Sequence, residues 1–200
     1  MMWWTAGVAA ALASEPLPEV VVAAFGRLAA PRTVQADFVQ VQHRAVLTRP
    51  FQSTGHLVFE RPDKLRWEVA APVASVFVMQ GAQMGSAWPS LGVSERLSLA
   101  GRPELMGLVH GLTVWLQADA VQVAEDYEVV IEEEAPLALA LTPRDATVRK
   151  WVDRIRLVVA DDGTWVRQVE LIEPDGDRVA MTFAAVVLDG APPAGAFDLP

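Results

Sequence analysis

The residues that most often carry out chemistry in proteins are scattered along this sequence. Its three histidines, His43, His56 and His110, lack a second ligand at metal-site spacing, such as another histidine one helical turn away. The acids at 132–134 are typical of a solvated strand end, and those at 161–162 and 175–177 occur in turn sequences. Neither a phosphate-binding glycine loop nor a nucleophile elbow occurs. We therefore expect no enzymatic activity, no metal site and no cofactor.

One charged residue stands out because of its place in a hydrophobic pattern. Residues 51–69 contain two runs of alternating apolar and polar residues around a turn at 61–64, the pattern of an antiparallel hairpin. Arg61 lies in phase with Leu57 and Phe59, so its guanidinium projects from the apolar face. An unpaired charge there costs on the order of several kcal/mol. Two interpretations stay open: Arg61 reaches water at the strand end, or it closes something over that face.

Periodicity elsewhere predicts the elements that would position Arg61. A helix from 18 to 30 ends at Pro31, and a second helix from 101 to about 116 places Leu105, Val109, Leu112 and Leu116 at helical spacing. A shift in apolar phase at Val39 predicts a bulge in the strand at 33–44. The remaining strands are expected at 75–79, 83–88, 94–99, 127–134, 137–142, 152–160, 164–173 and 179–188, with an irregular piece at 144–150.

The sequence therefore predicts about eleven strands and two helices. All connections but the helical one are short, so the sheet should be antiparallel and strongly bent, as a barrel or half-barrel. A half-barrel has a concave apolar face too large for its own side chains to fill. The two helices could plug this face, or a lipid chain could occupy it.

Bulk composition excludes several other classes of protein. The chain has 200 residues, 52% hydrophobic and 20% charged, which suits one folded domain with a sizeable core. Its net charge of −9, with no clustered basic patch, disfavours both nucleic acid and anionic membrane surfaces as partners. The absence of cysteine excludes disulfides, thiolate metal sites and thiol nucleophiles.

The N-terminus predicts export. Residues 1–13 form a short apolar run that ends in Ala-Leu-Ala, which matches a secretory cleavage site after Ala13. The run carries no Lys or Arg, and the alternative is a frayed N-terminal extension. We expect a signal peptide at 1–13, a single domain at 14–200, and a soluble compartment as the destination.

Several motifs together resemble the LolA family of periplasmic outer-membrane lipoprotein carriers. They are Phe38-x-Gln40, Gly55-x-Leu-x-Phe-Glu-Arg61-Pro62-x-x-Leu65-Arg66-Trp67-Glu68, Leu141-Thr-Pro143, Asp162-Gly-Thr164 and Phe197-Asp-Leu-Pro200. The resemblance implies an unclosed barrel of eleven antiparallel strands, mainly β, with helices as a lid over an apolar cavity. It also implies that Arg61 bonds to the lid and holds the empty cavity shut.

The same resemblance implies the cargo and the partners. Acyl chains of lipoproteins would lie in the cavity and travel through the periplasm from an inner-membrane transporter to an outer-membrane acceptor. We further expect a monomer that binds no nucleic acid. The expected cavity residues are Phe38, Leu57, Phe59, Leu65, Trp67, Val69 and Trp88 on the sheet, and Leu105, Met106, Val109 and Leu112 on the lid.

One departure from the family pattern bears on the cargo. These carriers usually have Asp-Gly followed by an aromatic-rich strand, whereas residues 80–85 read Gln-Gly-Ala-Gln-Met-Gly and only Trp88 follows. We expect the middle strands to be less bulky as a result. A carrier or sensor of another lipid, such as a glycolipid, a polyene or a free fatty-acyl lipid, is therefore the alternative.

Overall fold

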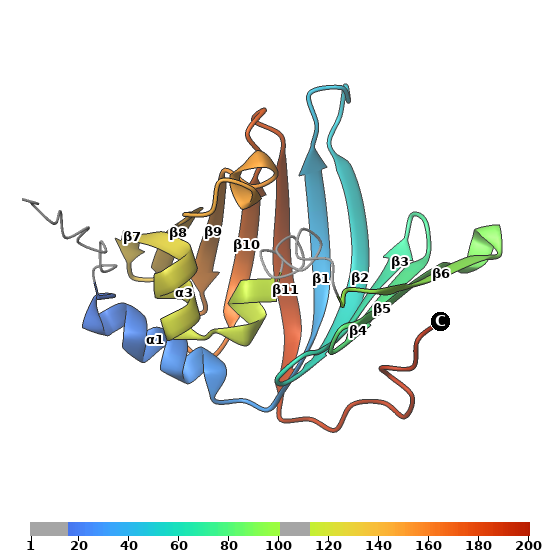
Figure 1. The fold of residues 1–200 in the computed structure, drawn as a ribbon, viewed down its shortest axis with the longest axis horizontal. Coiled ribbons are helices and arrows are strands. Elements are labelled where there is room, and N and C mark those ends of the chain that lie inside the picture. Colours follow the sequence, from blue (N-terminus) through green and yellow to red (C-terminus); the bar gives the residue numbers. More distant parts are fainter. Residues whose placement is uncertain (1–15, 101–112) are drawn as a thin grey trace, which may run out of the picture.

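A computed structural model describes residues 16–100 and 113–200, and strands dominate it (Figure 1). The eleven strands form one antiparallel sheet in the order β6-β5-β4-β3-β2-β1-β11-β10-β9-β8-β7. Strands β6 and β7 lie at the two ends of this order, so the sheet bends without closing. The predicted fold class, a mainly β, unclosed half-barrel with eleven antiparallel strands, is confirmed. The strands are β1 (Thr33–His43), β2 (Phe51–Glu60), β3 (Lys64–Ala71), β4 (Ser75–Gln80), β5 (Gln83–Trp88), β6 (Val93–Ser98), β7 (Tyr127–Glu134), β8 (Leu137–Pro143), β9 (Arg154–Val159), β10 (Val166–Ile172) and β11 (Arg178–Leu188).

Helical segments cover part of the concave face (Figure 1). Helix α1 (Glu19–Ala29) buries an apolar stripe, and residues 113–117 are helical, whereas most of the predicted second helix lies outside the described residues. Short 3-10 turns occur at η1 (Pro89–Leu91) and η2 (Val148–Lys150). None of the helices in the described part of the chain has the length and hydropathy to cross a bilayer.

Helix α3 (Ala120–Asp126) was not predicted, and the expected total of two helices is too low. Its seven residues bury only Val123, so the apolar periodicity is weak. The start signal is Asp119, whose carboxylate accepts the backbone N–H groups of Val121 and Gln122 at 2.9 and 3.2 Å. Helix α3 therefore depends on its N-cap and on contacts with α1.

The predicted bulge in β1 is wrong. Strand β1 pairs with β2 in unbroken register from Thr33 to Gln42, and Val39 simply faces the convex side with 40% of its surface exposed. The irregularity lies on the neighbouring strand, where Ala185 and Val186 of β11 stand opposite a single residue of β1. Ala185 takes a left-handed conformation, with φ of 50°. The apparent shift in the apolar alternation of β1 therefore comes from Val39, an apolar residue on the convex, solvent-exposed side.

The C-terminal tail, residues 190–200, covers part of the convex face. Arg96 donates to the backbone carbonyls of Leu199 at 3.0 Å and Pro200 at 2.9 Å. Gly85 lies beneath the same tail, since a Cβ there would stand 2.8 Å from the Pro200 ring. On this face Val58 and Val78 are fully buried although they oppose the main core. The sheet is therefore apolar on both sides over part of its width.

Candidate functional site

An apolar cavity of about 450 Å³ lies on the concave side of the sheet. Strands β1, β3, β4, β10 and β11 form its floor, because alternate residues of each strand face the same side. The helical segment 113–117 and the loop after η2 form its walls. The lining residues are Gln40, Arg44, Leu65, Trp67, Phe77, Thr113, Trp115, Leu116, Trp151, Val152, Leu171, Glu173, Val179 and Met181.

Aromatic packing fixes the shape of the cavity floor. The ring of Trp67 lies 4.4 Å from that of Phe38 and meets Phe183 edge-on at 6.4 Å. Trp115, from the helical segment, packs on the other side of Phe183 at 5.1 Å. Such tilted and edge-on pairs favour one arrangement over many. The floor is therefore preorganised where the helical segment meets the sheet.

Towards the β2–β3 turn the same trough is almost filled. Only about 30 Å³ is left there, between Leu28 of α1, Leu57 of β2, Trp115 and the guanidinium of Arg61. Such a volume holds one or two water molecules, not an acyl chain. The trough is thus closed near Arg61 and hollow towards the β1–β2 hairpin.

Arg61 closes the filled end through backbone carbonyls. It donates to the oxygens of Leu28 at 2.7 Å and Pro31 at 2.8 Å, and to that of Gln117. Leu28 lies in the last turn of α1 and Gln117 ends the helical segment, so both carbonyls belong to helix C-termini, where intrahelical donors run out. A cation also suits the negative end of a helix dipole.

The surroundings of Arg61 are apolar. Its guanidinium lies 5.5 Å from the centre of the Phe59 ring, and burial lowers the pKa of Arg61 below its ordinary value. Of the two interpretations that the sequence left open, the geometry matches the one in which Arg61 bridges the sheet to the elements that cover it. Whether this bridge acts as a latch in function stays a prediction.

The other predicted cavity residues fall into four groups. Leu65 and Trp67 line the large cavity and Leu57 lines the small one, whereas Phe38 and Phe59 are buried in the core beneath them. Val69 packs at the edge of the core, and Trp88 ends β5 and lines neither of these two cavities. The four expected lid residues lie outside the described residues: Leu105, Met106, Val109 and Leu112.

Several lining residues were missed, although their strands were predicted. Phe77, Leu171, Val179 and Met181 all belong to runs that the alternation identified as strands. The signal that could have found them is pairing: Phe77 stands opposite Trp67, so a lining residue on β3 implies one on β4. Trp151 gave no such signal, because it lies in a loop.

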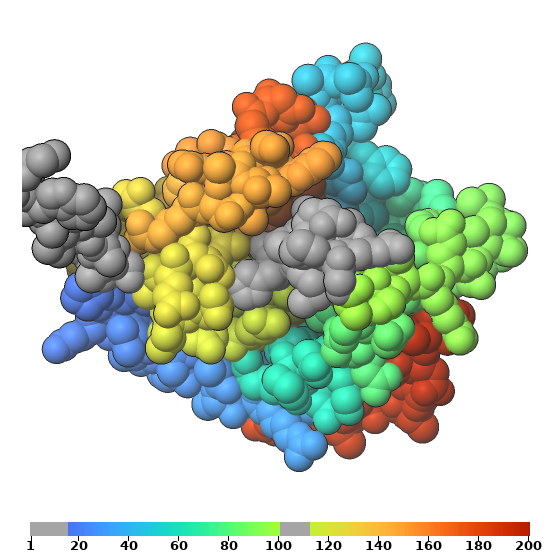
Figure 2. Space-filling view, in the orientation of Figure 1, coloured from blue at the N-terminus to red at the C-terminus, as the bar shows by residue number. Residues whose placement is uncertain are grey.

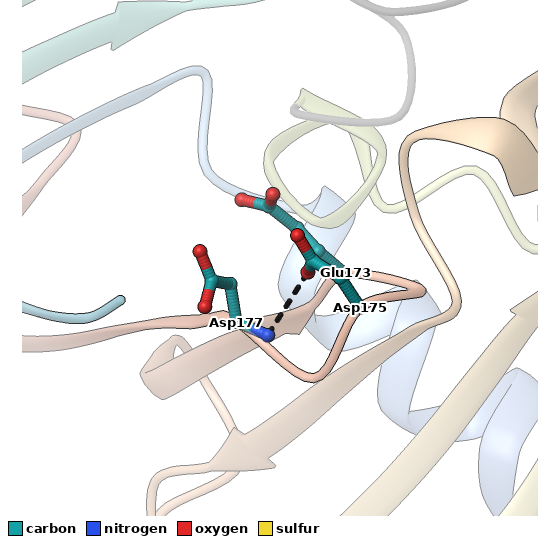
Figure 3. A group of neighbouring side chains, drawn as sticks. All are labelled: Glu173, Asp175 and Asp177. Carbon is teal, nitrogen blue, oxygen red and sulfur yellow. Dashed lines mark hydrogen bonds between the residues drawn. The ribbon is translucent and has the colours of Figure 1, made fainter. Parts of the chain in front are cut away.

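The cavity rim carries a cluster of three acidic residues (Figure 3), and Arg44 pairs with two of them. Carboxylate oxygens of Glu173, Asp175 and Asp177 lie within 4.8 Å of one another. The guanidinium of Arg44 contacts Glu173 at 2.6 Å and Asp177 at 3.4 Å, and Asp175 accepts the backbone N–H of Asp177 at 3.1 Å. Desolvation alone would lower the pKa of Arg44, but the two carboxylates raise it above its ordinary value. Arg44 therefore pairs with two of the three carboxylates of this cluster.

The departure at residues 80–85 does not enlarge the cavity. Gly81 takes a left-handed turn conformation, with φ of 58°, and Gly85 faces the tail on the convex side. The small residues are thus explained by a tight turn and by close packing behind the sheet. The strands are less bulky here, as expected, but Gly81 and Gly85 do not line the cavity, so any effect on the cargo stays a prediction.

An open antiparallel sheet whose concave apolar hollow is partly covered by helices defines a carrier-type scaffold for lipids. The chain belongs to the family of the outer membrane lipoprotein carrier protein LolA, whose model matches residues 30–200. No curated protein sequence matches the chain.

Solved structures share this fold at low sequence identity. An uncharacterized conserved protein from Thermus thermophilus is 11% identical, with 91% of this chain and 93% of that one covered and a TM-score of 0.52. MucB is 18% identical, with 92% and 64% covered and a TM-score of 0.51, so this chain spans about two thirds of it. A DUF1329 family protein from Desulfovibrio piger is 10% identical, with 90% and 94% covered and a TM-score of 0.50. At these identities the likeness shows the fold alone.

Proposed function

We propose that this protein is a periplasmic carrier that binds the acyl chains of lipoproteins in the 450 Å³ cavity and ferries them from the inner to the outer membrane. The cavity itself is the observation that supports this most directly. Its volume falls in the range of small-molecule sites, and its walls are mainly apolar and aromatic. The family name supplies lipoproteins as the cargo class.

The free energy gained by burying an acyl chain is so large that the carrier needs a mechanism for releasing it. Each buried methylene gains about 0.8 kcal/mol, so a chain of about sixteen carbons approaches ~12 kcal/mol. Release therefore needs a competitor for the cavity surface. The elements held by Arg61 provide one, since α1 and the segment 113–117 bury apolar side chains against the same sheet. Displacing them exposes apolar surface, and their return helps to expel the chain.

The direct test is a cavity-filling substitution. Leu171 lines the cavity, and Leu171→Trp places an indole where the acyl chain would lie. The control is Leu91→Trp, the same change on the exposed turn η1, whose residues line neither cavity. We expect Leu171→Trp to weaken binding of a fluorescent fatty acid about tenfold or more, while Leu91→Trp binds like the parent. Thermal unfolding of both variants checks that each still folds.

Cargo identity needs a separate measurement. Mass spectrometry of an organic extract of the protein from its native host should show lipoprotein-derived acyl groups. A free glycolipid, polyene or fatty acid would instead support the alternative cargo. A parent protein that binds no acyl ligand, or Leu171→Trp that binds like the parent, would contradict the proposal.

A further inference from the structure

We propose that the tip of the β1–β2 hairpin, residues 44–51, docks on the surface of a phospholipid bilayer and brings the mouth of the cavity against it. The biological role of this docking rests on the proposed function, whereas vesicle binding can be measured independently of it. The tip projects beyond the rest of the sheet (Figure 1). It stands on the upper edge of the molecule, together with the segment between β8 and β9 (Figure 2).

The tip leaves apolar side chains partly or almost wholly exposed to water. Val46 is 89% exposed, and Leu47 and Phe51 are also exposed. A single exposed apolar residue is ordinary, but three within one protruding turn form a surface that water solvates poorly. Partial insertion between lipid headgroups would remove these side chains from water while the hairpin stays folded.

The charges around these side chains favour a lipid surface over an apolar protein groove. The net charge of −9 disfavours anionic surfaces for the chain as a whole, but no acid occurs from residue 38 to residue 59. Of the two arginines in the tip, Arg44 already pairs with Glu173 and Asp177, and Arg49 is the cation that the tip offers to lipid. Arg49 makes no ion pair or hydrogen bond in the described part of the chain, so it is free to meet a phosphate. Cations beside exposed apolar residues are typical of segments that bind anionic membranes.

A second exposed segment extends the same edge. Trp151 is 63% exposed and lines the cavity, and it follows Arg149 and Lys150 in the chain. Tryptophan favours the interface between headgroups and acyl chains. Among the nearby acids, Glu173 and Asp177 share the single cation Arg44 and Asp175 accepts a backbone N–H, so Arg44 offsets one of their three negative charges.

The geometry connects the docking surface to the cavity. Arg44 is the first residue of the tip and also lines the cavity. Trp151, in the second exposed segment, lines the cavity as well. A bilayer that contacts both segments would therefore lie against the hollow end of the trough, opposite the end that Arg61 closes. An acyl chain could then pass from the membrane into the cavity without crossing bulk water.

The test is co-sedimentation with lipid vesicles. Val46→Ser with Leu47→Ser removes apolar surface from the tip without touching the cavity lining. The matched control is Val121→Ser on α3, a valine that is 70% exposed but lies away from the upper edge. Vesicles of phosphatidylethanolamine with phosphatidylglycerol, and of phosphatidylcholine alone, separate the contributions of charge and insertion.

We expect the double variant to partition into both kinds of vesicle about tenfold less than the parent, and Val121→Ser to match the parent. Arg49→Gln should reduce binding only to the vesicles that contain phosphatidylglycerol. Binding of a soluble fluorescent fatty acid should be unchanged in all three variants, which also shows that they fold.

Two outcomes would overturn the docking surface. One is a parent protein that binds neither kind of vesicle, even if it binds protein-containing native membranes, which would point to a protein partner. The other is a double variant that binds vesicles like the parent. Vesicle binding through the tip by a protein that takes no fatty acid would instead leave the docking surface standing and contradict the carrier function.

Discussion

Replacing Arg61 by leucine should favour the open form of the lid. The guanidinium donates to the carbonyls of Leu28, Pro31 and Gln117, two of which end helical segments that cover the trough. Hydrogen bonds from a charged donor contribute about 1.5–3 kcal/mol each. Solvent screening reduces that figure here, because the side chain is only half buried.

Loss of the two lid bonds should therefore shift the closed-to-open equilibrium by about 2–4 kcal/mol. Since 1.4 kcal/mol corresponds to a factor of ten, the open-to-closed ratio rises about 30- to 700-fold. Leucine also adds apolar surface to the small cavity. The variant should bind an acyl ligand more tightly and release it more slowly than the parent.

The assay is stopped-flow binding and release of a fluorescent fatty acid, combined with hydrogen exchange of α1. A matched control is Arg32→Leu, since Arg32 lies beside the same turn but is mostly exposed and pairs with Glu60 at 3.3 Å. Arg32→Leu should behave like the parent in both measurements. Equal release rates and equal protection of α1 in Arg61→Leu and the parent would refute the latch.

Three further predictions concern the scaffold. Burial, with a contribution from Asp126, raises the pKa of Tyr127 from 10.0 to about 12. The neutral phenol therefore stabilises the fold fully below pH 10, and this stabilisation is lost as the pH rises through about 12. Tyr127 is the only tyrosine, so its ultraviolet absorbance should titrate near pH 12 in the folded protein and near pH 10 in urea; one transition near 10 in both would refute this. Gly85→Val should displace the C-terminal tail from the convex face, seen as faster hydrogen exchange of the Ala196 and Asp198 amides; unchanged exchange would refute it. Asp119→Ala should cost about 1 kcal/mol of unfolding free energy through the lost N-cap of α3, measured by urea denaturation; no loss would show that the cap contributes nothing.

Local patterns were sufficient where the structure depends on local chemistry. Alternation at 51–69 predicted the β2–β3 hairpin, because a two-residue period places one face of each strand on the core. Asp-Gly pairs predicted the turns after β9 and β10, where Gly163 and Gly176 take φ of 73° and 88°. The strand count follows from such short-range signals, whereas the pattern left a barrel and a half-barrel open and the family resemblance implied the unclosed form.

Other features depend on partners that are distant in sequence. Val58 appears on the polar face of its strand, yet it is buried because residues 190–200 cross the convex side. A prediction from strand alternation takes one face of the sheet to be exposed to solvent. That premise fails here, because the C-terminal tail packs on the convex face. The position of the cavity also depends on contacts between distant parts of the chain, because it is set by how far the helical segments extend along the sheet.

Arg61 illustrates where sequence reasoning stops. Its phase in the strand shows that it points into an apolar space, and this is visible from Leu57 and Phe59 alone. The sequence does not identify its partners, because they are backbone carbonyls and every residue has one. The last carbonyls of any helix lack an intrahelical donor, whatever their side chains. The bridge therefore constrains where the lid helices end, not which side chains they carry. Replacing lid side chains that only face solvent should leave the bridge intact. Lengthening α1 by one residue at its C-terminus should weaken it, because the added residue displaces the Pro31 carbonyl that follows. Accelerated acyl binding in the lengthened variant, at unchanged fold, would support this reading, and an unchanged rate would contradict it.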